Sequence, residues 1–312
     1  MNVTKDSQAL NSSKASWCHR SIIDDEYIAV DYFFAVLSIA LNVLTCPPII
    51  LLNTLIIIAV KKKPSLQTTH NILLACLAAT DLTVGIAQPA FIAKDVLLTI
   101  GRSPFIYCTF YQILQTATLC LCLVSLFHLV LIGIERYVAM KYSLRYDSIV
   151  TESRLTVAVV LIWLIPTFYC VARIPGIRIA PDFLLFISVM LSLFAIIFCH
   201  ISVYLVSRRH MKQIKSEQVS TETKAKFLEE RKALITTTII LGGVLMSYLP
   251  SILTGLIMQG FPSSIARRIA VSSNPLTASC YLFNSLYNPV IYCWRNKVMQ
   301  QAVKQLLRKQ QR

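Results

Sequence analysis

Residues 184–206 read LLFISVMLSLFAIIFCHISVYLV, a run without a single Asp, Glu, Lys or Arg. A helix needs about 20 apolar residues to cross a hydrocarbon layer about 30 Å thick, and this run is long enough. Similar runs occupy residues 35–60 and 235–258. Because the bilayer interior offers no water to unpaired backbone groups, such runs must form helices. The pattern therefore predicts an all-α membrane protein.

The composition agrees with this prediction. Of the 312 residues, 55% are hydrophobic and 14% are charged, and the mean hydropathy of +0.62 exceeds that of ordinary soluble domains. Charged and turn residues divide the chain into seven apolar segments. We expect a seven-transmembrane helix bundle with segments near 31–60, 69–98, 105–139, 154–173, 183–208, 231–259 and 275–294.

Two short segments flank this expected domain of residues 31–294. Residues 1–30 are polar and acidic and have no apolar core of a signal peptide, so we expect an extracellular segment and insertion through the first membrane helix. In residues 295–312 basic and apolar residues alternate. This pattern is typical of a short amphipathic eighth helix that lies on the membrane surface and ends in a basic tail.

The distribution of basic residues along the chain predicts its orientation in the membrane. The net charge is +15, and an extracellular N-terminus places most of the 30 Lys and Arg residues on the cytoplasmic side, as the positive-inside rule requires. Asn2 and Asn11 begin Asn-X-Ser/Thr glycosylation sequons in the expected extracellular segment. The basic residues are split among short loops, which suits anionic membrane lipids as partners. We expect no nucleic-acid partner.

The chain has ten cysteines, and most fall in the expected membrane segments. Buried cysteine usually behaves as a small apolar residue. That interpretation covers Cys46, Cys76, Cys120, Cys122, Cys170, Cys199 and Cys280. Cys18 and Cys108 lie toward the oxidising side and can pair with each other. The sequence contains no Cys/His cluster with metal-ligand spacing.

Asp81 is an acidic residue in the middle of an apolar segment, LLACLAATDLTVGIAQP. Polar groups in a membrane core are costly, so each is a functional candidate. No basic residue lies within two turns of Asp81 on its own helix. A carboxyl group buried in this way either stays protonated or holds a cation.

Polar residues of other helices are the expected neighbours of Asp81. They are Asn53, Ser125, Asn284, Ser285 and Asn288. Asn284 and Asn288 share one helix face, and Pro289 cannot donate to the Ser285 carbonyl, which leaves that oxygen for water or an ion. Carboxylate, hydroxyl, amide and carbonyl oxygens are ligands of hard cations, with Asp81 as the metal ligand. The same groups can also tie helices together without an ion, and both interpretations stay open.

Glu135-Arg136-Tyr137 ends the third segment at the cytoplasmic side. Arg136 can pair with its neighbour Glu135 or with an acid on another helix. Glu230 begins the sixth segment at the same membrane level. An Arg136–Glu230 pair would close the cytoplasmic face, and its value would be that of a switch between two arrangements.

Taken in their order along the chain, the motifs resemble those of class A (rhodopsin-like) G-protein-coupled receptors, and the resemblance extends from about residue 31 to residue 308. Each segment carries one marker. These are Asn53, Asp81, Glu135-Arg136-Tyr137, Trp163, Tyr204, Pro250 and Asn288-Pro289-Val290-Ile291-Tyr292. One such motif is weak evidence for the family, but seven motifs in the family's order on seven apolar segments are specific evidence. The resemblance implies a plasma-membrane receptor for an extracellular ligand that is not an enzyme and that activates a heterotrimeric G protein.

The resemblance also implies roles for single residues. Arg136 would contact the G protein, and Tyr204 and Tyr292 would move to support it. The sodium and water pocket, which favours the inactive state, would consist of Asp81, Ser125, Asn284, Ser285 and Asn288. Pro250 and Pro289 would kink their helices, so that the cytoplasmic half of the sixth helix can swing outward. Apart from sodium, no cofactor is expected.

Several positions depart from the family pattern. Tyr248 stands where tryptophan is usual, and Ile196 where proline is common. Cys108 lies about one turn earlier than usual, and the loop RIPGIRIAPD at 173–182 has no cysteine. The usual disulfide between the third helix and this loop is therefore absent or replaced. The short loop and the missing fifth-helix proline resemble the melanocortin, cannabinoid and lysophospholipid receptor branch.

The ligand is constrained mainly by what is missing. Thr118 stands where amine receptors place an aspartate, and Leu282 where opsins place the retinal lysine. The expected ligand pocket comprises Lys94, Asp95, Gln115, Thr118, Tyr248 and Arg173. Arginines at the outer helix ends can bind an anionic lipid head group or an acidic peptide, or can be solvated loop charges. A lipid or peptide ligand is thus favoured over an amine.

Two other classes of protein compete with this interpretation. Tyr248 and the displaced Cys108 leave room for a ligand-independent receptor that signals constitutively or modulates a partner. An ion-coupled transporter with Asp81 as its relay would need an inverted repeat or a continuous polar path, and the sequence shows neither. An enzyme is not expected, since no pairing of a nucleophile with a base is apparent.

Overall fold

A computed structural model of the chain describes residues 25–99, 104–172, 182–216, 239, 242–243, 245–254, 256–257 and 272–310. All regular secondary structure in these ranges is helical, which confirms the predicted class. The long helices are α2 (Asp25–Lys62), α3 (Thr69–Thr99), α4 (Pro104–Lys141), α6 (Glu152–Val171), α7 (Asp182–Ser216) and α10 (Asn274–Arg295). The shorter ones are η1 (Pro64–Leu66), η2 (Ser143–Arg145), α5 (Tyr146–Ile149) and α11 (Lys297–Gln310).

Five helices of the described part are long and apolar enough to cross a membrane. These spans are Tyr32–Lys62, Thr69–Leu97, Thr116–Lys141, Glu152–Val171 and Ile187–Arg209. They coincide with the first five predicted segments. A shorter apolar helix, Leu245–Thr254, falls in the sixth predicted segment, and α10 occupies the seventh.

Two helix ends differ from the prediction. α2 begins at Asp25, within the residues that the sequence assigned to the extracellular segment. α7 continues to Ser216, past the expected end at residue 208. The residues that follow 208 include Arg, Met, Lys and Gln but no Gly or Pro, and these are good helix formers. The charged residues there mark the membrane boundary without ending the helix.

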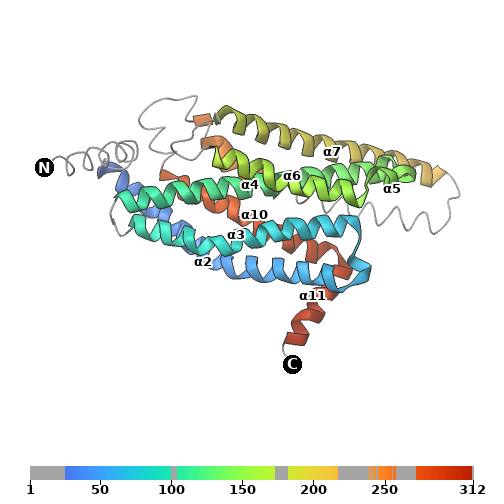
Figure 1. Cartoon of the computed structure of the whole chain (residues 1–312), viewed down its shortest axis with the longest axis horizontal. Coiled ribbons are helices and arrows are strands. Elements are labelled where there is room, and N and C mark those ends of the chain that lie inside the picture. The colour runs from blue at the N-terminus through green and yellow to red at the C-terminus, as the bar shows by residue number, and fades with distance from the viewer. Residues whose placement is uncertain are drawn as a thin grey trace.

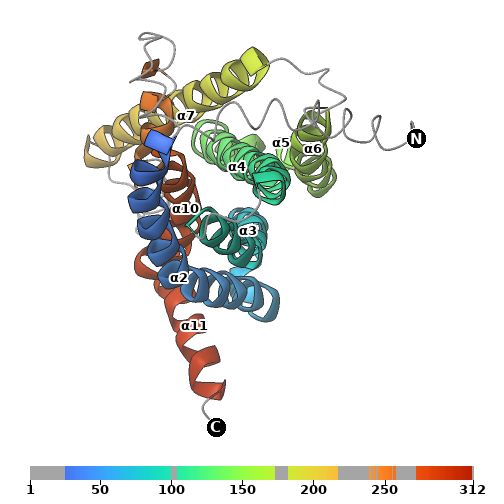
Figure 2. The ribbon, with the colours of Figure 1, turned by 90° about the vertical axis from the view of Figure 1, so that its left-hand side faces the viewer.

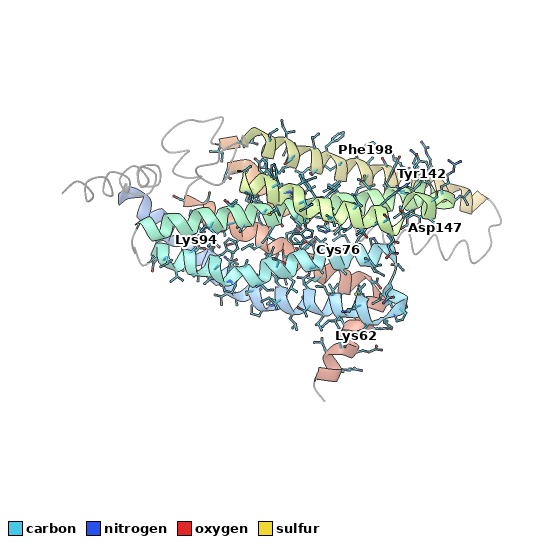
Figure 3. All side chains as sticks on the ribbon, viewed as in Figure 1. Lys62, Cys76, Lys94, Tyr142, Asp147 and Phe198 are labelled. Carbon is cyan, nitrogen blue, oxygen red and sulfur yellow. The ribbon has the colours of Figure 1, made fainter. Side chains whose placement is uncertain are left out.

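The long helices lie side by side in a bundle (Figure 1), which Figure 2 shows nearly end-on. α3 packs against α2, α4 and α10, while α4 also packs against α6 and α7. α11 contacts α2 and α10 and then runs away from the bundle in both views. Lys94 lies toward one end of the bundle, and Lys62, Tyr142 and Asp147 lie toward the other (Figure 3). α3 and α4 therefore form the centre to which the other helices attach.

The apolar core has two main parts. The larger cluster includes Leu77 and Ala78 of α3, and the smaller one includes Val84, nearly two turns further along the same helix. Asp81 lies between them in sequence and is fully buried. The polar residues around Asp81 thus form a layer between two apolar clusters.

Gly85 marks a close approach of α3 to α2. A Cβ atom at this position would lie 2.8 Å from Cγ2 of Ile49 and 2.9 Å from Cγ1 of Ile50. The Cys46 thiol also donates to the Gly85 carbonyl over 3.5 Å. Any side chain larger than hydrogen would push these two helices apart next to Asp81.

We predict that Gly85→Ala lowers the stability of the protein. Overpacking of a tight contact costs about 1–3 kcal/mol, which outweighs the gain in helix propensity. The matched control is Gly133→Ala in α4, where the new Cβ would meet Cys199 Cβ at an ordinary 3.5 Å. Thermal unfolding of the purified protein in detergent measures the stability of both variants. Equal midpoints for the two variants would contradict this packing.

Candidate functional site: polar layers inside the bundle

Two residues of α10 donate hydrogen bonds to the Asp81 carboxylate. Its Oδ1 accepts a hydrogen bond from Ser285 Oγ at 2.8 Å, and its Oδ2 accepts one from Asn288 Nδ2 at 2.9 Å. All three side chains are buried. The structure thus brings together Asp81, Ser285 and Asn288, three of the residues that the sequence grouped.

Asn53 joins α2 to the same layer. Its Nδ2 donates to the carbonyl of Ile49 at 2.9 Å and to the carbonyl of Ser285 at 3.0 Å. Pro289 has no N–H to offer that Ser285 carbonyl. The expectation that the carbonyl is left for water or an ion is therefore corrected, because Asn53 supplies the missing donor.

Several oxygens of this layer lack a donor. In the described residues, the buried atoms without a hydrogen-bond partner include Asn53 Oδ1, Ser125 Oγ, Asn284 Oδ1 and Asn288 Oδ1. A buried polar atom without a partner costs about 1–3 kcal/mol. Water or a cation would remove that cost. One carboxylate among neutral oxygens carries a single negative charge, so this set of ligands fits a monovalent hard cation such as sodium.

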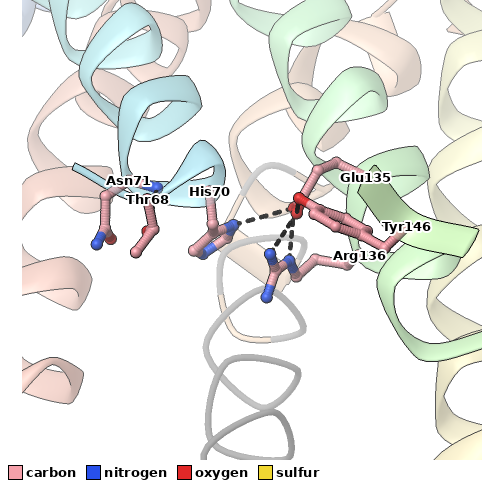
Figure 4. A network of polar contacts seen from close by, with 6 residues as sticks. All are labelled: Thr68, His70, Asn71, Glu135, Arg136 and Tyr146. Carbon is pink, nitrogen blue, oxygen red and sulfur yellow. Dashed lines mark hydrogen bonds and ion pairs between the residues drawn. The ribbon is translucent and has the colours of Figure 1, made fainter. Parts of the chain in front are cut away.

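A second buried carboxylate lies at the cytoplasmic end of α4 (Figure 4). Glu135 is only 2% exposed. Its Oε2 accepts from Arg136 Nε at 2.5 Å, and its Oε1 pairs with a second guanidinium nitrogen. Of the two partners that the sequence offered Arg136, the structure shows Glu135. Glu230 lies outside the described residues.

Two further groups bind Glu135, and the sequence analysis missed both. Tyr146 of α5 donates its hydroxyl to Glu135 Oε1 at 2.7 Å, and His70 Nδ1 of α3 lies 3.3 Å from Oε2. Burial, followed by the negative charge of Glu135, raises the pKa of Tyr146 to about 12. Tyr146 therefore keeps its proton and remains a donor. The close-up in Figure 4 shows the carboxylate enclosed by His70, Arg136 and Tyr146.

Tyr137, the third residue of the motif, faces α7. Its hydroxyl lies 2.5 Å from Lys141 Nζ, and its ring is 6.4 Å from that of Phe198. Tyr204 of α7 is 56% exposed, so much of its side chain lies on the outside of the bundle. Tyr292 belongs to α10, but its side chain lies outside the described residues.

A third polar cluster occupies the outer half of the bundle. Lys94 and Asp95 form a buried ion pair, with Nζ and Oδ1 2.8 Å apart. Ser38 of α2 donates to Asp95 Oδ2 at 2.6 Å and lies 2.8 Å from Ser279 Oγ of α10. Asn42 extends the cluster, since it donates to Ser279 at 3.1 Å. The charges of the two expected ligand-pocket residues thus compensate each other.

Two more residues of the expected ligand pocket are engaged inside the protein. Thr118 is buried and donates to the Leu114 carbonyl at 2.8 Å. Tyr248 donates to the Cys122 carbonyl at 3.0 Å, and its ring is 5.0 Å from that of Tyr281. Tyr248 therefore joins the sixth helix to both α4 and α10.

The remaining predicted residues are placed as follows. Pro250 lies in the helix Leu245–Thr254, and Pro289 lies inside α10, which continues past it. Outside the described residues or side chains fall Asn2, Asn11, Gln115, Arg173 and the predicted pair of Cys18 and Cys108.

Comparison with known proteins agrees with this architecture. Residues 52–181 match the family described as "7 transmembrane receptor (rhodopsin family)". The chain is 25% identical to the histamine H2 receptor of Rattus norvegicus, over 81% of this chain and 74% of that receptor. It is 28% identical to human trace amine-associated receptor 6, over 81% and 79% of the two chains. It is 24% identical to the rat melanocortin receptor 5, over 95% and 87%.

The chain therefore belongs to the rhodopsin family, the class A G-protein-coupled receptors, a family that implies a seven-helix membrane bundle. It is a multi-pass receptor of the plasma membrane, not an enzyme, and its family implies coupling to a heterotrimeric G protein. Identity to the rat melanocortin receptor 5 is no higher than identity to the histamine H2 receptor or to trace amine-associated receptor 6. The comparison thus leaves the ligand class undecided.

We predict that Tyr146→Phe destabilises the receptor, because it removes one of the two hydrogen-bond donors to Oε1 of the buried Glu135 carboxylate. A hydrogen bond to a charged group contributes about 1.5–3 kcal/mol. Thermal unfolding in detergent measures the loss. Tyr204→Phe is the matched control, since that side chain is 56% exposed. If both substitutions left the unfolding midpoint unchanged, the Tyr146–Glu135 hydrogen bond would not contribute to the stability of the protein.

Proposed function

We propose that this receptor senses an extracellular ligand and activates its G protein when the cytoplasmic half of the sixth helix moves outward. The observation that carries the proposal is the pairing of Arg136 with Glu135. Arg136 is the residue that the family motif assigns to G-protein contact, and here Glu135 holds its guanidinium group. Activation then requires Arg136 to leave Glu135. His70 and Tyr146 continue to bind the carboxylate when it does so.

Two tyrosines support a role for the sixth helix as the moving part. Tyr248 binds the Cys122 carbonyl of α4, and Tyr287 of α10 donates to the Ile239 carbonyl at 3.2 Å. These hydrogen bonds attach the sixth helix to its neighbours above and below Gly243. A Cβ on Gly243 would lie 1.9 Å from the Tyr287 ring, so the glycine is needed for this contact. Outward movement would break the lower attachment, and Pro250 provides the hinge.

The layer around Asp81 is proposed to hold sodium and water. Asp81, Ser125, Asn284, Ser285 and Asn288 would bind the ion. The bound cation would compensate the charge of Asp81 between two apolar clusters. An ion in this position favours the packing in which α3 and α10 are joined, which we assign to the inactive state. The unpartnered oxygens of Ser125, Asn284 and Asn288 support this proposal.

A lipid or peptide ligand is favoured over an amine. An ammonium ligand needs an uncompensated carboxylate, but Thr118 carries no charge and Asp95 is paired with Lys94. A groove of about 340 Å³ opens between α2, the sixth helix and α10. Met246 and Phe283 give it apolar walls, and Asn42 and Ser279 give it a polar floor. These surfaces suit an amphiphilic lipid with a hydroxyl or amide group.

Ligand-independent signalling is the second candidate. The Tyr248 hydroxyl is satisfied by the Cys122 carbonyl and needs no ligand. A receptor of this kind would show high basal activity that no lipid or peptide increases. Measuring activity with and without ligand panels therefore separates the two candidates.

We predict that Arg136→Ala abolishes G-protein activation in cells exposed to panels of lipids and peptides. Removal of the G-protein contact should reduce the signal at least about tenfold, equivalent to about 1.4 kcal/mol. Arg154→Ala is the control, because Arg154 is an exposed arginine at the start of α6. Equal expression at the cell surface is verified for each variant. Undiminished signalling by Arg136→Ala would refute the coupling role.

We predict that sodium raises the thermal stability of the purified receptor relative to choline at equal ionic strength. Asp81→Asn should abolish that difference, because it removes the one charge that compensates the ion. Asp95→Asn should retain the difference, since Asp95 belongs to the separate outer cluster. A sodium effect that survives in Asp81→Asn would place the ion elsewhere.

A further inference from the structure

The groove between α2, the sixth helix and α10 lies at the depth of the bilayer interior. Phe283, one of its lining residues, lies two residues before Ser285, which donates to the buried Asp81 carboxylate. Thr45, another lining residue, accepts a hydrogen bond from Gln88 of α3 at 2.9 Å. Gln88 lies seven residues or about 10 Å beyond Asp81, and α3 continues for 11 residues beyond Gln88. Hydrocarbon rather than water therefore surrounds the groove.

The groove is open toward the lipid side of the bundle. Met246 and Phe283, which form its apolar walls, are 69% and 48% exposed. Gly242 also lines the groove, and a Cβ atom at this position would have no atom within 4 Å. Exposed surface at this depth of a membrane protein faces lipid chains. An occupant therefore reaches the groove from the bilayer and is itself soluble in lipid.

The chemistry of the lining excludes a charged head group. None of the described residues that line the groove is Asp, Glu, Lys, Arg or His. A phosphate, carboxylate or ammonium group bound there would have no counter-charge in an apolar medium, and burying an unpaired charge is costly. The occupant is therefore neutral.

The hydroxyl groups of the lining have already used their hydrogen atoms. Each of the four donates to a backbone carbonyl, at 2.8 Å from Thr45, 2.8 Å from Ser247, 3.0 Å from Ser279 and 3.2 Å from Tyr287. The side-chain nitrogen of Asn42 donates to two serine hydroxyls. A hydroxyl that donates keeps lone pairs that can accept. The lining thus offers acceptors, and the occupant has to supply the donor.

The neighbouring network is also short of donors. Gln88 Nε2 donates to Asn42 and Thr45, but among the described residues Gln88 Oε1 is a buried acceptor without a donor. Thr45 and Ser279 already accept hydrogen bonds, from Gln88 at 2.9 Å and from Asn42 at 3.1 Å. Ser247 Oγ is therefore the acceptor to which we assign the donor of the occupant. A lipid with ester or ether oxygens alone would add acceptors to a site that already has a surplus of them.

We propose that the groove binds a neutral membrane lipid with a free hydroxyl group, which enters from the bilayer and donates a hydrogen bond to Ser247. This inference rests on the proposed function, which assigns the groove to a lipid ligand, and it adds the chemistry of the head group and the route of entry. The apolar walls receive the hydrocarbon part of the lipid. Monoacylglycerols and sterols share this chemistry, whereas lipid phosphates do not.

The test uses the full-length receptor in lipid nanodiscs and three photoreactive, alkyne-tagged lipids with the same acyl chain. A monoacylglycerol carries neutral hydroxyl donors, the methyl ester of the same fatty acid carries no donor, and the 3-phosphate of the monoacylglycerol adds charge. We expect the monoacylglycerol to label the groove about two- to tenfold more strongly than either of the others, the effect of one hydrogen bond. Mass spectrometry locates the label, which should lie on the peptides that contain Met246 and Phe283.

Unlabelled monoacylglycerol and unlabelled cholesterol then compete with the monoacylglycerol probe. Displacement by either one supports the proposal and shows which source of the hydroxyl the groove prefers. Displacement by neither would overturn it. Equal labelling by all three probes would show contact with the acyl chain alone and would also overturn it.

Two variants link the labelling to the groove. Gly242→Phe should abolish labelling, because the new side chain fills open space. Ser247→Ala should lower labelling about two- to tenfold. The matched control is Ser192→Ala, since Ser192 is a buried serine of α7 that donates to the carbonyl four residues earlier at 2.7 Å. Thermal unfolding verifies that each variant is folded. Labelling of Ser247→Ala equal to that of Ser192→Ala would contradict the assigned hydrogen bond and overturn the proposal.

G-protein activation by the same monoacylglycerol in cells separates this inference from the proposed function. A lipid that labels the groove through Ser247 but leaves signalling unchanged would support the inference and contradict the groove as the site of the ligand of the receptor. Signalling in response to a peptide, with the groove unlabelled by the monoacylglycerol, would overturn the inference and leave the proposed coupling intact.

Discussion

The burial of the Asp81 carboxyl group is the constraint on which the rest of the bundle depends. A carboxyl group in an apolar interior is costly unless hydrogen-bond donors surround it. Ser285 and Asn288 provide them, and this fixes the rotation and height of α10 against α3. Asn53 then binds the carbonyl that Pro289 leaves without a donor, which aligns α2. Three helices are thus positioned by one side chain, and apolar packing fills the space around them.

The polar layers lie at different depths of the bundle and serve different tasks of a receptor. The outer cluster joins α2, α3 and α10 through Asp95, Ser38 and Ser279. At the cytoplasmic end, Glu135 holds the arginine on which G-protein coupling is proposed to depend. Among the described residues of the sixth helix, hydrogen bonds of the Tyr248 and Tyr287 hydroxyls join it to α4 and α10. An element joined by hydrogen bonds that can break and re-form can have two arrangements of similar free energy, which the proposed mechanism requires.

The sequence predicted the features that follow from the free-energy cost of burying polar groups and from the pattern of apolar residues. Apolar runs located the membrane helices, and the expense of burying Asp81 together with the spacing of Asn284 and Asn288 identified its layer. It did not predict the binding of His70 and Tyr146 to Glu135. Those contacts depend on how each helix is rotated about its axis. A single histidine or tyrosine in the sequence carries no signal of that rotation, whereas proximity in the structure reveals it.

The most direct test of the central claim is a double-mutant cycle between Asp81→Ala and Asn288→Ala. Unfolding free energies of the purified receptor, compared among wild type, the two single variants and the double variant, give the coupling between α3 and α10. If Asp81 positions α10, the coupling energy should be about 1–3 kcal/mol, because each single substitution leaves the other group buried without its partner. Strictly additive effects would show that apolar packing alone sets the position of α10 and would contradict this account.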